Sequence, residues 1–371
     1  MLGRVVVTRD EVGVRFPLSA APGTGAWTTT RRGAWTGGFW AGLLWLRARH
    51  TGERADRAAA EACTARLAGW AEADTATRGL ILWYGTALAP DSAAATTLRA
   101  HAARTCLTAL DPELGLVPWG SAFGGPRLLA RADAVPGLVP LLASAGPRGR
   151  AAAASHLHRH LDLCVGATPR LAPAWEHTPA TGWRPLAEPA PGWSRGRAWL
   201  LLAVADALVH PHGAVGDPDH LHAVARRLGA PLTAARPADG AVYADPTAAP
   251  AAPPLVPPAD EDRPDGPLDT SAAAITAVAL LKLAALPGAE DCARRAEAIL
   301  HRLVCAHLSG TGTATTGTTA DPGPARPAGM LLDGCHDAPT ATAVQHELIW
   351  GDFFLALGLA VLTGDVDPRD V

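Results

Sequence analysis

The residues best suited to chemistry lie in one short run, from Trp193 to Trp199. Arg195 and Trp199 are four residues apart, so they share one face of the first turn of a helix. A guanidinium binds a carboxylate through two parallel hydrogen bonds, and indole faces stack on apolar ring faces. The run therefore favours a site for a flat, anionic ligand. The alternative is a structural helix start, with Ser194 as its N-cap and the tryptophans in the core.

Composition narrows the class of ligand. The chain has 371 residues, with 48% hydrophobic and 18% charged residues, which is enough for a large core. It carries 32 basic and 35 acidic residues for a net charge of −3, without a basic stripe, which disfavours nucleic acid as a partner. Several of the 12 tryptophans lie in Gly-rich turns. We therefore expect a small-molecule or sugar-like substrate.

Cysteine and histidine usage indicates a protein without a metal. The six cysteines form no C-x-x-C pair and fit a reduced cytosol. His156, His158 and His160 are spaced by two along a predicted helix, so they fan out. No nucleotide-binding loop is found, and we expect no cofactor.

The N-terminus lacks the apolar stretch of a signal peptide, and no apolar run reaches the ~20 residues of a membrane span. These features predict a cytoplasmic protein with no membrane partner.

Apolar residues recur with helical period over most of the chain. The pattern predicts eleven helices, at 35–50, 53–73, 79–89, 91–109, 134–145, 148–165, 194–210, 217–229, 270–286, 289–308 and 347–362. They occur in pairs joined by short turns, with longer loops such as 232–268 and 309–327 between pairs. Repeated pairs predict an all-α toroid that forms a single domain over residues 1–371. Residues 1–34 are expected to form an irregular N-terminal arm.

Four stretches carry a resemblance to a known family. They are Trp35–Trp45, Trp193–Trp199, Asp269–Ile275, and Gly329–His336 with its continuation Glu347–Phe354. In this order and spacing the chain resembles the unsaturated glucuronyl hydrolases and their sister family, the unsaturated rhamnogalacturonyl hydrolases. The resemblance implies a six-hairpin, glycosidase-like (α/α)6 barrel, here with one helix missing at the N-terminus.

The resemblance also implies a reaction. In the family, an aspartate protonates the C4=C5 enol-ether bond of a terminal unsaturated uronic acid, water adds at C5, and the hemiketal collapses, without a metal or organic cofactor. This aspartate falls on Asp133, which would act first as an acid and then as a base. From the residues alone, the more common role for such an aspartate is the N-cap of helix 134–145.

The substrate pocket implied by the resemblance is rich in indoles. The residues expected to bind substrate are Trp35, Phe39, Thr77, Trp119, Trp193, Arg195, Trp199 and His336. Arg195 would form part of the same wall as the tryptophans, and His336 stands where the family often has a tyrosine. The alternative for this group is packing of inner helices at the mouth of the barrel, because stacking platforms and core tryptophans look alike in sequence.

The chain departs from the family at polar positions. The family's second aspartate, in a His-Asp-x-Gly-Phe motif, falls on Thr77, and the motif's histidine falls on Ala76. A further histidine and a glutamine fall near Pro173 and on Arg184. Three hypotheses remain: a hydrolase or hydratase that uses Asp133, a repurposed barrel enzyme of small-molecule biosynthesis, and a non-catalytic sugar-binding barrel. The retained carboxylate favours the first two.

Overall fold

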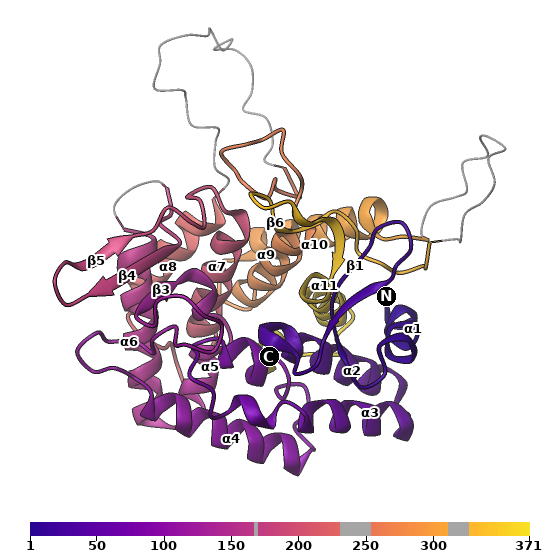
Figure 1. The fold of residues 1–371 in the computed structure, drawn as a ribbon, viewed down its shortest axis with the longest axis horizontal. Coiled ribbons are helices and arrows are strands. Elements are labelled where there is room, and N and C mark those ends of the chain that lie inside the picture. Colours follow the sequence, from indigo (N-terminus) through magenta and orange to yellow (C-terminus); the bar gives the residue numbers. More distant parts are fainter. Residues whose placement is uncertain (167–169, 231–253, 311–325) are drawn as a thin grey trace, which may run out of the picture.

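The computed structural model describes residues 1–166, 170–230, 254–310 and 326–371. Within these ranges, the centre of the protein is a ring of six helical segments (Figure 1). They are α2 (Gly37–Thr51), the short π-helix η3 (Gly79–Trp83), α5 (Leu138–Ala143), α7 (Ser194–Leu208), α9 (Thr270–Leu283) and α11 (Ile349–Leu362). Each segment packs against the next in chain order, and α11 packs against α2. The inner ring is therefore closed.

A second layer of helices surrounds the ring. It consists of α1 (Leu2–Val12), α3 (Arg54–Ala65), α4 (Ala93–Thr108), α6 (Pro147–Cys164), α8 (Pro218–Gly229) and α10 (Glu290–His307). Each outer helix packs against at least one inner helix. The inner helices α7 and α9 are buried on nearly every side, whereas α8 and α10 bury one stripe. This arrangement is an (α/α)6 toroid, so the predicted fold class is confirmed, and every predicted helical range contains an observed helix.

Inner and outer helices alternate along the chain, which gives the toroid two different ends. Short turns lead from an inner helix to the next outer helix, as between α2 and α3. Longer connections lead into the inner helices, so the N-terminal ends of these helices gather at one end. We call this end the mouth and define it by the segments 34–36, 75–78, 129–137, 190–193, 254–269 and 334–348. Parts of the predicted loops 232–268 and 309–327 lie outside the described residues.

Two small antiparallel sheets border the mouth. One has the order β2 (Trp27–Thr30), β1 (Phe16–Ala20), β7 (Thr342–Leu348) and β6 (Gly334–Asp337). The other has the order β3 (Leu129–Arg131), β4 (Ala174–Thr178) and β5 (Gly182–Pro185), and its β4–β5 hairpin projects from one side of the molecule (Figure 1). Because β3 runs directly into the 3-10 turn η4 (Ala132–Ala134) and β7 runs into α11, the sheets position the chain where it enters the mouth.

The prediction of an irregular arm over residues 1–34, with a missing N-terminal helix, is wrong. Residues Leu2–Val12 form α1, which packs against α2 as the outer helix of the first pair. Three consecutive valines at positions 5–7 have weak intrinsic helix propensity, so tertiary contacts decide the conformation. One of these contacts is a buried ion pair between Arg4 and Glu347, with a nitrogen–oxygen distance of 2.7 Å.

Glycines allow the inner segments to approach one another closely. A Cβ atom on Gly38 would lie 2.2 Å from the carbonyl oxygen of Leu80. A Cβ atom on Gly79 would lie 2.1 Å from the backbone nitrogen of Leu138. Backbone atoms cannot move aside as a flexible side chain can. The contacts of η3 with α2 and with α5 therefore require glycine at both positions.

We predict that Gly38→Ala lowers the free energy of unfolding by about 1–3 kcal/mol, because the added methyl group must displace the backbone of η3. Gly229→Ala in α8 is the matched control, since a Cβ atom there meets no atom within 4 Å. Urea unfolding followed by circular dichroism measures both changes. Equal stability of the two variants would contradict the close packing of the ring.

Candidate functional site

Arg195 lies at the start of α7 and is enclosed by the protein. Its Nη1 donates to Asp269 Oδ2 at 2.5 Å and to the carbonyl oxygen of Cys335 at 2.5 Å. Its Nη2 donates to the carbonyl oxygen of His336 at 2.6 Å. The side chain of Arg195 is only 5% exposed, and that of Asp269 is fully buried. These contacts favour the structural interpretation of Arg195 over a role in gripping a ligand carboxylate.

The first turn of α7 is not capped as the sequence suggested. Trp193 occupies the N-cap position without a side-chain bond, and the Ser194 hydroxyl donates to the carbonyl oxygen of Ala259. The cap instead belongs to the next inner helix, where Asp269 Oδ1 accepts from the backbone amides of Ser271 and Ala272. One carboxylate thus caps α9 and holds the arginine of α7.

Phe39 and Trp199 are core residues. They are 0% and 1% exposed, and their rings stack with centroids 6.1 Å apart. Phe354 packs against both rings. The prediction that these two side chains bind substrate is therefore wrong. The periodicity that placed them on inner helices also points them at the helices opposite, where they fill the centre of the toroid.

A cluster of partly exposed rings does lie at the mouth. Trp35 contacts the buried Trp350 at a centroid distance of 4.8 Å and His336 at 6.1 Å. Trp193 lies against the Arg195 guanidinium, 5.4 Å from ring centroid to Cζ. Burial, followed by the charge of Arg195, lowers the pKa of His336 to about 4, so its imidazole is neutral near pH 7. Trp35, Trp193 and His336 thus form an uncharged wall.

Asp133 lies in η4, between β3 and α5. The expected N-cap role is wrong, because α5 begins at Leu138 after Gly137, which has a φ of 70°. The change of direction at Pro136–Gly137 delays the helix. Instead, Asp133 forms a two-pronged ion pair with Arg131: Nε donates to Oδ1 at 3.0 Å, and Nη2 donates to Oδ2 at 3.2 Å.

Arg131 is a residue that the sequence pattern did not single out. Its Cζ lies 4.7 Å from the ring centroid of Trp119, so the guanidinium rests between an indole and a carboxylate. The side chains of Arg131 and Asp133 are 25% and 20% exposed. Arg131 is the last residue of β3 and Asp133 lies in the η4 turn that follows, so the chain brings the two side chains together. The position of an arginine two residues before the candidate acid was the feature of the sequence that could have identified Arg131.

Two residues on α6 lie behind this pair. Burial lowers the pKa of His160 to about 4 and raises the pKa of the Cys164 thiol, and both groups feel the charge of Asp133. His160 is therefore neutral near pH 7. Its Nδ1 lies 2.8 Å from the carbonyl oxygen of His156, and its buried Nε2 has no partner among the described residues. His160 and Cys164 thus add no charge beside the Arg131–Asp133 ion pair.

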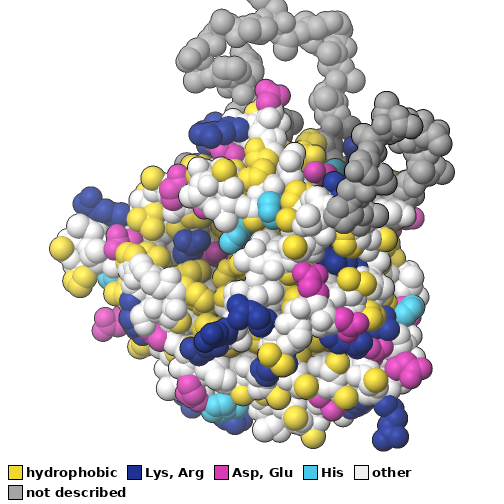
Figure 2. All heavy atoms as spheres, turned by 45° about the vertical axis from the view of Figure 1, so that its right-hand side comes forward, with side chains coloured by type: hydrophobic (Ala, Val, Ile, Leu, Met, Phe, Trp, Pro, Cys, Tyr) yellow, Lys and Arg dark blue, Asp and Glu magenta, His cyan; other side chains and the backbone are white. Residues whose placement is uncertain are grey.

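Thr77 stands at the mouth but does not open onto it. It is 2% exposed, and its hydroxyl lies 2.9 Å from that of Thr75, just before η3. The η4 turn that carries Asp133 packs against α7, whose first residues border the Trp35–Trp193–His336 wall. The partly exposed Arg131–Asp133 pair and the uncharged aromatic wall thus both lie at the mouth. Figure 2 shows a hollow in the surface in which hydrophobic, basic and acidic side chains lie together.

Comparison with known proteins supports the fold. No protein-family model and no curated protein matches the sequence. Among solved structures, an unsaturated glucuronyl hydrolase from Bacillus sp. GL1, responsible for the degradation of glycosaminoglycan, matches with a TM-score of 0.75 at 20% identity, over 97% of this chain and 94% of that one. The chain has the fold of the unsaturated glucuronyl hydrolases.

Two further glucuronyl hydrolase structures agree. One that is specific for heparin has a TM-score of 0.76 at 19% identity, and the alignment covers 99% of this chain and 96% of that chain. One from Streptococcus agalactiae has a TM-score of 0.77 at 16% identity, and the alignment covers 99% of this chain and 91% of that chain. The predicted barrel is thereby confirmed over almost its whole length, and at these identities the likeness establishes the fold.

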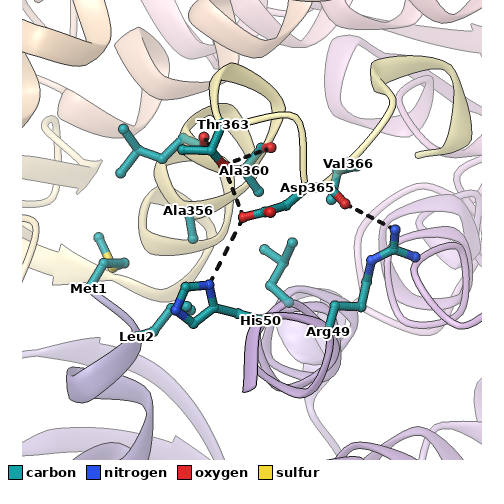
Figure 3. Close-up of a pocket in the computed structure, with 11 residues that line it drawn as sticks. Met1, Leu2, Arg49, His50, Ala356, Ala360, Thr363, Asp365 and Val366 are labelled. Carbon is teal, nitrogen blue, oxygen red and sulfur yellow. Dashed lines mark hydrogen bonds and ion pairs between the residues drawn. The ribbon is translucent and has the colours of Figure 1, made fainter. Parts of the chain in front are cut away.

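A cavity of about 180 Å³ lies away from the mouth of this glucuronyl hydrolase fold. It is lined by the C-terminal parts of α2 and α11 and by Met1 and Leu2 (Figure 3). His50 and Asp365 approach to 4.0 Å at its edge.

In the described ranges, no helix combines the length and apolar content of a membrane span, and no three metal-ligating side chains form a group.

We predict that Arg195→Met lowers the free energy of unfolding by about 3–5 kcal/mol, because it leaves the buried Asp269 carboxylate without its partner. Arg127→Met is the control, since Arg127 and Asp74 form an exposed pair worth about 0–1 kcal/mol. Thermal and urea unfolding measure both variants. Similar losses for the two would show that Arg195 does not hold the mouth together.

Proposed function

We propose that the protein is a glycoside-hydrolase-like enzyme that uses Asp133 as acid and base on an enol-ether or sugar-like substrate. The observation that carries the proposal is the position of Asp133. It is a partly exposed carboxylate at the mouth, paired with an arginine that lies over the Trp119 indole, on a fold whose solved neighbours are hydrolases. A carboxyl group at such a position can reach a bound sugar ring, and the indoles nearby offer it a stacking face.

The proposed reaction needs one proton that is given and then taken back. Asp133, in its protonated form, would transfer the proton to the C4 carbon of an enol-ether double bond, and positive charge would develop at C5. Water would then add at C5 while Asp133, now a carboxylate, accepts the proton that the water loses. The resulting hemiketal opens and releases the second sugar. Each cycle consumes one water and restores Asp133, without a cofactor.

A changed substrate is the second candidate, and two observations favour it. Thr77 places a buried hydroxyl where the family has its second aspartate. Arg131 occupies both oxygens of Asp133. Under this alternative the barrel has been repurposed, for example in small-molecule biosynthesis, and Asp133 moves a proton on another substrate. A non-catalytic sugar-binding barrel is the third hypothesis, which loss-of-turnover experiments separate from the first two.

We expect Asp133→Asn to lower turnover about 10²- to 10⁴-fold, the usual cost of losing a general acid or base. The assay follows the loss of the ultraviolet absorbance of the C4=C5 bond in unsaturated uronyl disaccharides. Asp74→Asn is the matched control, because Asp74 forms the same two-pronged pair with Arg127 on an exposed surface. Turnover that survives in Asp133→Asn would remove Asp133 from the mechanism.

Thr77→Asp distinguishes the two enzymatic hypotheses. If the protein acts on unsaturated uronides, the restored carboxylate should raise that activity. If the substrate has changed, the variant should gain none and should lose stability, because position 77 is buried and a carboxylate there would be desolvated. The disaccharide assay and a melting curve give both values. Thr77→Val, which replaces the hydroxyl by a methyl group of similar size, is the control for the lost bond to Thr75.

A further inference from the structure

The pair between Arg131 and Asp133 has a consequence for the acid role of Asp133, and the following inference rests on that proposed function. Both oxygens of Asp133 accept a hydrogen bond from the guanidinium, at 3.0 and 3.2 Å. An acid must carry its proton on one of those oxygens. In this arrangement each oxygen faces a donor N–H, so a proton on either oxygen would have to displace one of the two guanidinium hydrogen bonds.

The Arg131 guanidinium is held by contacts that do not involve Asp133. Its Cζ lies 4.7 Å from the Trp119 ring centroid, and its backbone pairs with Ala174 in the β3–β4 ladder. The charge of Asp133 raises the pKa of Arg131, which is therefore always charged. With the guanidinium fixed by the indole and the strand, a change of partner costs little rearrangement. The pair is also within reach of solvent, at 25% and 20% side-chain exposure.

Three other arginines at or near the mouth pair with different carboxylates. Arg195 is locked to Asp269 and to two carbonyl groups. Arg197 pairs with Glu261 at 3.2 Å, and Arg127 pairs with Asp74. None of these carboxylates is the candidate acid. Arg131 differs because its partner is the residue expected to react, so any anion that binds Arg131 changes the state of that residue.

We propose that Arg131 exchanges partners when ligand binds: a carboxylate of the ligand takes the guanidinium fork and releases Asp133. The flat, two-pronged donor set of arginine matches a carboxylate, and the Trp119 face lies beside it for a sugar ring. Arg131 is thus the residue that binds the anionic group. It is also the positioning residue that holds Asp133 in the ion pair in the free protein. Ligands without a negative charge leave Asp133 paired.

The exchange predicts that removing the carboxylate of Asp133 improves binding. We expect Asp133→Ala to bind D-glucuronate about three- to tenfold more tightly than the unmodified protein, because the internal competitor for Arg131 is gone. Affinity for D-glucose, which has no carboxylate, should not change. The double variant Asp133→Ala with Arg131→Met should lose the gain. Titrations followed by nuclear magnetic resonance of the sugar measure these affinities, with circular dichroism to confirm folding.

Asp74→Ala is the matched control, since it frees Arg127 from a pair of the same geometry that is 53% and 42% exposed. It should leave glucuronate affinity unchanged. The proposal is overturned if Asp133→Ala binds glucuronate no more tightly than the unmodified protein, or if glucose gains equally. These are equilibrium measurements that need no turnover. The affinities can contradict the exchange while Asp133→Asn still stops catalysis, and they can support the exchange when no catalysis is found.

Discussion

The buried pair between Arg195 and Asp269 is the interaction on which the mouth depends. Asp269 Oδ2 accepts from Arg195 of α7, and Oδ1 accepts from the Ser271 hydroxyl at 2.5 Å. That hydroxyl in turn accepts from Trp350 Nε1 at 2.9 Å. The chain of contacts joins the first turns of α7, α9 and α11, three neighbouring inner helices. A buried ion pair costs desolvation, and this one recovers the cost through a complete set of hydrogen bonds.

This use of Arg195 shapes what the mouth can do. An arginine whose donors meet a carboxylate and two carbonyl groups holds the protein together and has little left for a ligand. The neighbouring wall of Trp35, Trp193 and neutral His336 is uncharged. The Arg131–Asp133 ion pair adds partly exposed charge at another part of the mouth, in the segment before α5. The site is therefore divided into a rigid aromatic side and a polar side whose ion pair is open to exchange.

The helices were predictable from sequence, and the roles of particular side chains were not. The predicted helices are present because each one buries apolar residues that recur with the local helical period. That period can be seen in the sequence. The α1 helix was missed because its stability comes from distant contacts, such as the one between Arg4 and Glu347, rather than from propensity. Arg195 and Trp199 share a helical face, as expected, but periodicity does not tell whether a face meets a ligand, a carboxylate or another ring. Those outcomes depend on residues more than 70 positions away, such as Asp269.

The contacts that hold the toroid together are separate from the residues of the candidate site, so the fold can persist while the site changes. The glycine contacts and the Arg195–Asp269–Ser271–Trp350 network lie inside the ring and involve atoms that no ligand needs to touch. Thr77, Arg131 and Asp133 lie in the connections before η3 and α5, where a new side chain alters local bonds without moving an inner helix. The buried hydroxyl of Thr77 lies 2.9 Å from that of Thr75, and Asp133 has a partner two residues away in Arg131. Both local arrangements are compatible with an intact toroid, so the barrel constrains where a substrate lies more strongly than which substrate it is.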